Sequence, residues 1–192
     1  TYTCGTLARQ FPDVYACAPT HKAAWVLQDK IGMDTMTVHS FLNLKLVPDY
    51  QGGHKLIPQE ENDDLDGVVL LDESSMVGMD LWNYIDQTDA QWVFIGDPAQ
   101  LPPVAQKAAP ALDFDGGHLD HIVRQEANNP ILEVATRIRK GERPYLKGSA
   151  MRDGKGVGVT HDSESFRKSA ARLFMDHADD PRHVRILAYR NE

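Results

Sequence analysis

Short apolar runs alternate with amphipathic stretches along the first part of the chain. The runs at 14–18, 68–71 and 92–95 are short enough to be buried strands, while 21–31 and 79–85 have the apolar spacing of helices. This alternation is typical of βαβ units that share a largely parallel sheet. The pattern therefore predicts an α/β fold with strands arranged as in a P-loop protein.

The pattern changes between 44 and 58, where Gly52 and Gly53 separate two short runs of mixed polarity. Two adjacent glycines tolerate the positive φ angles of a tight turn, so this segment predicts a β-hairpin. The acidic stretch 60–66 that follows is typical of a solvated loop leading back into the sheet.

A second unit is expected to begin near Leu119. The sequence Asn128-Asn129-Pro130 supplies an N-cap and a first-turn proline for a helix that ends at Gly141. The rest of this unit is expected to contain three elements: a glycine-rich loop at 148–158, a helix at 163–177 and a strand at 184–189.

With 192 residues, of which 42% are hydrophobic and 25% charged, the chain is long enough for one large or two small domains. Its net charge of -8 argues against binding polyanions through bulk electrostatics, although a groove lined by a few cations still holds a nucleic-acid strand. Cys4 and Cys17 form no CxxC pair, so reduced thiols are expected. No stretch approaches the roughly 20 apolar residues that span a bilayer, and no signal peptide is evident. We therefore expect a cytoplasmic protein without a membrane partner.

Two polar clusters follow neighbouring strands of the predicted sheet. Asp72 and Glu73 come directly after the run 68–71, and the segment 96–104 follows the run 92–95. Because ligands bind at the carboxyl edge of a parallel sheet, both clusters are expected at a ligand site. An Asp-Glu pair suits magnesium and an attacking water. The alternative is an acidic pair that only caps the following helix.

The second cluster, Gly-Asp-Pro-Ala-Gln-Leu-Pro-Pro-Val, contains Gln100. Its amide can hydrogen-bond both a γ-phosphate and an attacking water, so it would report whether the terminal phosphate is present. The alternative is a common Gly-Asp-Pro turn in a loop stiffened by Pro102 and Pro103.

The segments 72–76, Asp-Glu-Ser-Ser-Met, and 96–104 resemble motifs II and III of superfamily 1 DNA helicases, in the RecD and Dda-like branch that moves 5′ to 3′. Other segments agree in order and spacing. Ala-Pro-Thr-His-Lys-Ala-Ala at 18–24 looks like motif Ia, Thr-Val-His-Ser-Phe at 37–41 looks like motif Ic, and 123–125 with the following Asn-Pro helix looks like motif IV. The resemblance covers essentially the whole chain.

This resemblance implies a RecA-like parallel sheet flanked by helices. Residues 1–118 would be domain 1A, incomplete at its N-terminus, with a domain 1B hairpin inserted at about 43–66. Residues 119–192 would be the first part of a second RecA-like domain, 2A. The implied function is an ATP-dependent DNA helicase that translocates on single-stranded DNA and unwinds duplexes.

The resemblance also implies roles at the nucleotide. ATP and Mg²⁺ would be the cofactors, with Asp72 as a metal ligand, Glu73 activating water and Gln100 sensing the γ-phosphate. Arg124 would act as an arginine finger, where the alternative is an ordinary surface or helix-capping arginine. Thr1 would be a further magnesium ligand if it is the last residue of a Walker A motif.

On the DNA side, the resemblance implies that the motif Ia segment lies along one strand while the motif Ic segment contacts backbone or bases. A histidine or phenylalanine ring can stack on unpaired bases without regard to sequence. The alternatives are a helix N-terminal residue for His21 and a core aromatic for Phe41. Pro48 and Tyr50, near the hairpin tip, are candidates for a wedge that splits the duplex, although an ordinary surface hairpin is equally compatible. The DNA-binding residues implied are Pro19, Thr20, His21, Thr37, His39, Ser40 and Phe41.

The chain departs from the family pattern in lacking a Walker A sequence, G-x-x-x-x-G-K-[ST], and motifs V and VI. Lys22 cannot replace the Walker lysine because it belongs to motif Ia. We therefore expect the central part of a longer helicase, inactive or nearly so as an ATPase on its own. The expected partners are single-stranded DNA, junctions of single and double strands, and replication or recombination proteins, in a bacterial or phage-infected cytoplasm. Two alternatives stay open: a non-catalytic single-strand-binding or assembly module that has lost its P-loop, and some other P-loop ATPase.

Overall fold

The computed structural model describes residues 2–50, 54–59, 66–119, 129–143, 149–152, 155–180 and 183–187. The chain divides into two compact units, residues 1–118 and residues 119–192. Each unit is described by itself. Their assignment to domains 1A and 2A stays a prediction.

The first unit is built on a four-stranded sheet in the order β2-β1-β5-β6, in which every neighbouring pair is parallel. The strands are β1 (Val14–Ala18), β2 (Met36–Thr37), β5 (Val68–Asp72) and β6 (Gln91–Ile95). Because β5 lies between β1 and β6, its apolar residues are buried from both sides. The predicted α/β class, the parallel sheet and the strands at 14–18, 68–71 and 92–95 are confirmed.

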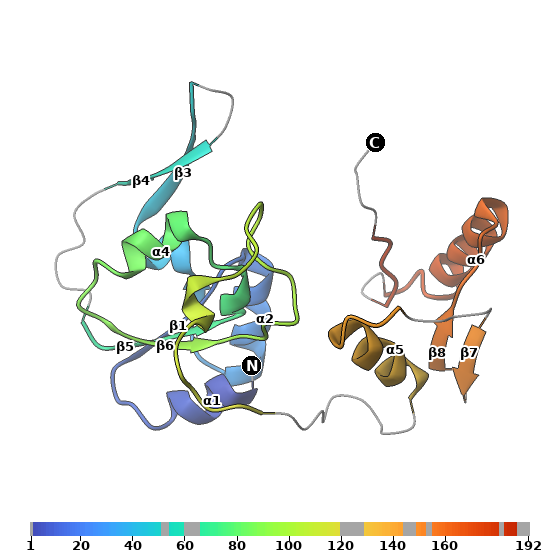
Figure 1. Cartoon of the computed structure of the whole chain (residues 1–192), viewed down its shortest axis with the longest axis horizontal. Coiled ribbons are helices and arrows are strands. Elements are labelled where there is room, and N and C mark those ends of the chain that lie inside the picture. Colours follow the sequence, from blue (N-terminus) through green and yellow to red (C-terminus); the bar gives the residue numbers. More distant parts are fainter. Residues whose placement is uncertain are drawn as a thin grey trace. The chain divides into compact units, whose positions relative to one another are not determined.

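Helices cover both faces of this sheet (Figure 1). They are α1 (Tyr2–Ala8), α2 (His21–Ile31), the single turn α3 (Val38–Phe41) and α4 (Met79–Ile85). The helices predicted at 21–31 and 79–85 are confirmed. Helix α2 begins where the Thr20 hydroxyl accepts a hydrogen bond from the Ala23 amide, at 3.2 Å, and it ends at Gly32, whose φ of 71° suits glycine.

Two apolar clusters fill the space between sheet and helices. The smaller joins Cys4 of α1, Ala16 of β1 and Leu27 of α2. In the larger, Cys17 of β1 packs with residues of α3, β5 and α4. Adjacent strand residues point to opposite faces, so Ala16 and Cys17 anchor different clusters. The sheet is therefore buried on both faces, as a parallel sheet requires.

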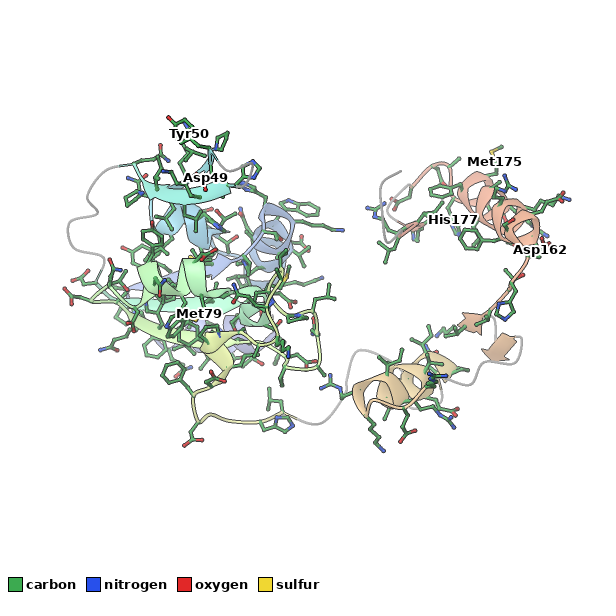
Figure 2. All side chains as sticks on the ribbon, turned by 45° about the horizontal axis from the view of Figure 1, so that its top comes forward. Asp49, Tyr50, Met79, Asp162, Met175 and His177 are labelled. Atoms are coloured by element: carbon green, nitrogen blue, oxygen red, sulfur yellow. The ribbon has the colours of Figure 1, made fainter. Side chains whose placement is uncertain are left out.

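The hairpin consists of β3 (Leu44–Pro48) and β4 (His54–Pro58), which pair antiparallel. The predicted hairpin is thus confirmed, although its proposed Gly52-Gly53 turn lies outside the described residues. The Tyr84 hydroxyl of α4 donates a hydrogen bond to the Leu56 carbonyl, at 3.0 Å, and ties the hairpin to that helix. Tyr50 is fully exposed at the hairpin end (Figure 2).

Phe41 lies in the larger cluster with only 6% of its surface exposed. Its ring packs against Tyr15 and, edge to face, against Trp92, with centroid distances of 5.2 and 5.6 Å. The predicted stacking of Phe41 on DNA bases is therefore corrected to a core role. The physical reason is that α3 is a single turn, so its last side chain points back into the apolar space beside the sheet.

The second unit contains α5 (Pro130–Arg139) and α6 (Ser163–Asp176), which confirm the two predicted helices. Asn129 caps α5 by accepting a hydrogen bond from the Ile131 amide at 3.0 Å, and Pro130 takes the first helical position. Asp162 caps α6 in the same way, through the Glu164 and Ser165 amides.

Two predictions for this unit are wrong. The segment 148–158 contains an antiparallel pair, β7 (Ser149–Arg152) and β8 (Lys155–Gly158), because glycine lacks a side chain but keeps the backbone groups that form a ladder. Residues 184–187 are not a strand and pair with no strand in the described chain, since an apolar run needs a partner to become one; 188–189 lie outside it. Within the described residues, no helix is both long and apolar enough to cross a membrane.

Replacing Phe41 with alanine should lower the free energy of unfolding by about 3–5 kcal/mol, because it leaves a cavity among Tyr15, Trp92 and their neighbours. Chemical denaturation measures this change. Tyr50→Ala, at a fully exposed aromatic residue, serves as the control and should be neutral within about 0.5 kcal/mol. Equal effects of the two substitutions would contradict the core position of Phe41.

Candidate functional site

Asp72 and Glu73 occupy the carboxyl end of the central strand β5. Asp72 is 7% exposed, and its Oδ1 accepts a hydrogen bond from the Glu73 amide at 3.1 Å. Glu73 has a φ of 55°, in the left-handed region that non-glycine residues rarely adopt. Such a conformation costs about 1–3 kcal/mol and persists only where the surroundings enforce it, which occurs most often at functional sites.

The end of β6 lies directly beside this acidic pair. Asp72 is the register partner of Ile95, so Glu73 and Gly96 are the first residues beyond two strand ends that lie side by side. A Cβ at Gly96 would lie 2.6 Å from the Ser74 Oγ and 2.9 Å from the Ser75 amide nitrogen. Only glycine therefore lets the loop after β6 pass this close to the residues after Glu73.

Ser74 and Ser75 belong to a 3₁₀ turn, Ser74–Met76, that follows the acidic pair. Both side chains are buried, and neither Oγ atom has a hydrogen-bond partner among the described residues. Buried hydroxyls without a partner are uncommon and costly. The site thus retains hydrogen-bonding capacity next to Asp72 and Glu73.

Gln100 lies in an exposed loop organised by Asp97. The Asp97 Oδ1 accepts a hydrogen bond from the Ala99 amide at 3.0 Å, and the Asp97 carbonyl accepts one from the Gln100 amide at 3.0 Å. The Gln100 side chain donates to Asp97 Oδ2 at 3.4 Å. The Gly-Asp-Pro turn is therefore present, as the alternative interpretation predicts, and it leaves Gln100 exposed to solvent.

Cys4 of α1 contributes to the surroundings of Asp72. Burial first, and then the negative charge of Asp72, raises the pKa of the Cys4 thiol from 9.0 to about 11. Burial raises the pKa of Cys17 to about 12. Both cysteines are free, in agreement with the predicted reduced thiols, and both remain protonated at neutral pH.

The carboxyl ends of β1 and β2 bring the two predicted DNA-binding segments together. Ala18 is the register partner of Thr37, so the segments that begin at Pro19 and Val38 leave the sheet side by side. Thr37 is buried and caps α3: its Oγ1 accepts from the Ser40 amide at 3.1 Å and lies 2.8 Å from the Ser40 Oγ. Thr20 caps α2 and is exposed.

His21 and His39 meet at this edge. Burial, and then the charge of His21, lowers the pKa of His39 below its ordinary value of 6.5. His21 and Ser40 are exposed, while Pro19 and His39 are half-buried. The two segments therefore form one polar surface in which His39 is neutral at pH 7.

The donors present fit a magnesium ion of the kind that binds with a nucleotide. Such an ion takes one or two protein carboxylates and completes its octahedron with phosphates and water. Asp72 and Glu73 offer this set. No three His, Cys, Asp or Glu side chains gather as a metal site in the parts of the chain that the structure describes. The predicted residues Thr1 and Arg124 lie outside those parts.

Sequence reasoning missed three features of this site: the close approach at Gly96, the buried hydroxyls of Ser74 and Ser75, and a contact from Gln106 to α4. The Gln106 Oε1 accepts a hydrogen bond from the Met79 amide at 3.0 Å, across 27 positions of sequence. Gly96 could have been singled out from the sequence, since it directly follows a predicted strand and begins the segment that resembles motif III. A side-chain contact over such a separation leaves no local pattern.

Residues 5–162 match the family described as AAA domain. The chain is 31% identical to the ATP-dependent DNA helicase dda of Enterobacteria phage T4 over 195 residues, which cover 93% of this chain and 43% of that protein. It is 32% identical to the ATP-dependent RecD2 DNA helicase of Deinococcus radiodurans over 143 residues, 69% of this chain and 18% of that protein. An uncharacterized protein of Acanthamoeba polyphaga mimivirus is 28% identical over 134 residues, 55% of this chain and 27% of that protein. The chain thus spans less than half the length of each of these relatives.

Replacing Gly96 with alanine should lower the free energy of unfolding by about 1–3 kcal/mol, because its Cβ would overlap Ser74 and the Ser75 backbone. Gly116→Ala is the matched control, since a Cβ there meets nothing within 4 Å. Thermal or chemical denaturation compares the two. A Gly96 variant as stable as the Gly116 variant would contradict the close approach.

The lowered pKa of His39 predicts a loss of stability in mild acid. Below about pH 6.5 the unfolded chain binds a proton at His39 before the folded protein does, so the free energy of unfolding falls until the pH passes the folded pKa. His39→Asn should flatten the stability profile between about pH 6.5 and pH 5. His161→Asn, at an exposed histidine, should leave the slope unchanged. Denaturation at a series of pH values tests this, and parallel slopes for wild type and His39→Asn would refute it.

Proposed function

Because the chain belongs to the AAA domain family, we propose that it is part of the motor of an ATP-dependent DNA helicase. In this proposal it couples ATP hydrolysis to 5′ to 3′ movement along single-stranded DNA and to unwinding of the duplex. One observation supports it: the acidic pair, the Gln100 loop and the segments after β1 and β2 all follow the carboxyl ends of strands in a single parallel sheet. The similarity to two ATP-dependent DNA helicases supports the same conclusion.

On the nucleotide side, Asp72 would hold Mg²⁺, and Thr1 would add a hydroxyl ligand if it is the last residue of a Walker A motif. When bound, Mg²⁺ neutralises charge that develops on the transferred phosphoryl group. Glu73 takes a proton from the attacking water. Gln100 orients that water and contacts the γ-phosphate, and Arg124 acts as an arginine finger that stabilises the charge of the transition state.

The local structure suits this division of work between neighbouring carboxylates. Asp72 is buried and fixed by the Glu73 amide, as a metal ligand must be to hold its geometry. The left-handed backbone of Glu73 ends the regular alternation of side chains along β5, so the direction of its carboxylate is not set by that of Asp72. A metal ligand and a base can therefore act at different atoms of one nucleotide.

On the DNA side, Pro19, Thr20, His21, His39 and Ser40 contact one strand. Thr37 acts indirectly, since its hydroxyl caps α3 and orders Ser40. His39 is neutral at pH 7, so it hydrogen-bonds or stacks and adds no positive charge. Contacts of this kind read no sequence, which suits a motor that must move along any strand.

The remaining parts are assigned as follows. Residues 1–118 form domain 1A, the hairpin within about 43–66 forms domain 1B, and residues 119–192 begin domain 2A. The exposed Tyr50 at the hairpin end provides an aromatic surface to wedge between the strands at a fork. Proteins of replication or recombination are the expected partners, in the cytoplasm of a bacterium or a phage-infected cell.

Replacing Glu73 with glutamine in the full-length protein tests the central step. The amide keeps the size and hydrogen-bonding ability of the side chain but cannot accept a proton at neutral pH. We expect DNA-stimulated kcat for ATP to fall by about 10²- to 10⁴-fold, while nucleotide binding is retained. Steady-state ATPase assays and titration with a fluorescent nucleotide measure the two quantities.

Glu164→Gln is the matched control, because Glu164 is an exposed carboxylate that pairs with Lys168 on α6. It should leave both kcat and binding unchanged. Unchanged turnover in Glu73→Gln would show that another group is the base. Absence of ATPase and DNA binding in the unaltered full-length protein would overturn the proposed function itself.

A further inference from the structure

The segment 97–105, which contains Gln100, is held at both ends by the residues that follow Glu73. At its start, Gly96 passes against Ser74 and Ser75 so closely that no side chain fits between them. Directly after its end, Gln106 hydrogen-bonds the Met79 amide. The residues between the two contacts therefore form a closed loop on the chain segment that carries the acidic pair.

Gln106 provides the cap that α4 lacks locally. The N-cap residue of α4 is Gly78, which has no side chain to accept a hydrogen bond from the first amides of the helix. The Gln106 Oε1 accepts from one of them, Met79, at 3.0 Å. A Cβ at residue 78 would lie 2.7 Å from the Gln106 Nε2, so the glycine also makes room for the incoming side chain.

The backbone conformation before Gln106 sets the position from which the Gln106 side chain extends. Ala105 has a φ of 60°, which is strained for alanine, and the Gln106 amide donates a hydrogen bond to the Pro103 carbonyl at 3.1 Å. Pro103 is buried. A tight turn on a buried proline fixes the backbone of Gln106, so its side chain extends toward α4 from a defined position.

We propose that Gln106 is a positioning residue that joins the Gln100 loop to the segment carrying Glu73. The inference rests on the proposed function, in which Gln100 and Glu73 act on the same attacking water. If the two segments moved independently, the water would be oriented for only part of the time. The bond from Gln106 keeps them in one geometry during hydrolysis, without touching ATP.

The experiment compares three variants of the full-length protein with the wild type: Gln106→Ala, Gln106→Glu and Lys107→Ala. Gln106→Ala removes the acceptor, Gln106→Glu keeps an acceptor oxygen of the same reach, and Lys107→Ala changes the exposed neighbour. Loss of one hydrogen bond that orients a reacting group corresponds to about a tenfold fall in kcat. We expect that fall in Gln106→Ala with KM for ATP unchanged, and near wild-type kcat in the other two variants.

Amide hydrogen exchange provides a second readout that does not depend on activity. Gln106→Ala should speed exchange at the Met79 amide and at the loop amides of Ala99 and Gln100, whereas Gln106→Glu should preserve their protection. Unchanged kcat in Gln106→Ala, failure of Gln106→Glu to restore it, or unchanged exchange at Gln100 would each overturn the proposal. If the wild type hydrolyses no ATP, the proposed function fails, and the exchange measurement still decides whether Gln106 joins the two segments.

Discussion

The parallel pairing of β5 with β1 and β6 is the constraint on which the candidate site depends. The registers set Leu71 beside Cys17 and Asp72 beside Ile95, so three strands end at one level. Because Val69, Leu70 and Leu71 are all fully buried, a slip of β5 by one residue would carry Gly67 or Asp72 into the position of an apolar residue of the strand. The position of the Asp72 carboxylate is therefore set by hydrophobic burial several residues away.

The strained backbone of Glu73 becomes understandable from the contacts around it. Asp72 accepts a hydrogen bond from the Glu73 amide on one side, and the Ser74–Met76 turn packs against Gly96 on the other. Contacts that fix the chain on both sides of a residue can hold that residue in an unfavourable backbone conformation. The same neighbours bury the hydroxyls of Ser74 and Ser75, so rigidity at the acidic pair is gained at the expense of unsatisfied polar atoms.

Much of this arrangement was predictable because its signals are local. The strands at 14–18, 68–71 and 92–95 are apolar runs with clear limits, and α2 and α5 carry caps in their sequence, Thr20 and Asn129. The misses are contacts made across the fold. Nothing near Phe41 distinguishes a core ring from an exposed one in a helix of a single turn, and glycines alone did not distinguish the β7 and β8 ladder from a loop. The hydrogen bond that Gln106 accepts from the Met79 amide is likewise set by tertiary structure.

The acidic composition of the chain bears on how the proposed motor grips DNA. With a net charge of -8, the chain offers nucleic acid no excess of positive charge overall, so any cations that contact phosphates must be local. The surface at the ends of β1 and β2 offers hydroxyls and histidines, and its half-buried His39 is neutral at pH 7. In the proposed function, affinity at this surface would come from hydrogen bonds, from stacking at about 1–3 kcal/mol per base, and from local cations such as the exposed Lys22. The salt dependence of DNA binding would then follow these few local cations and not the net charge of the chain.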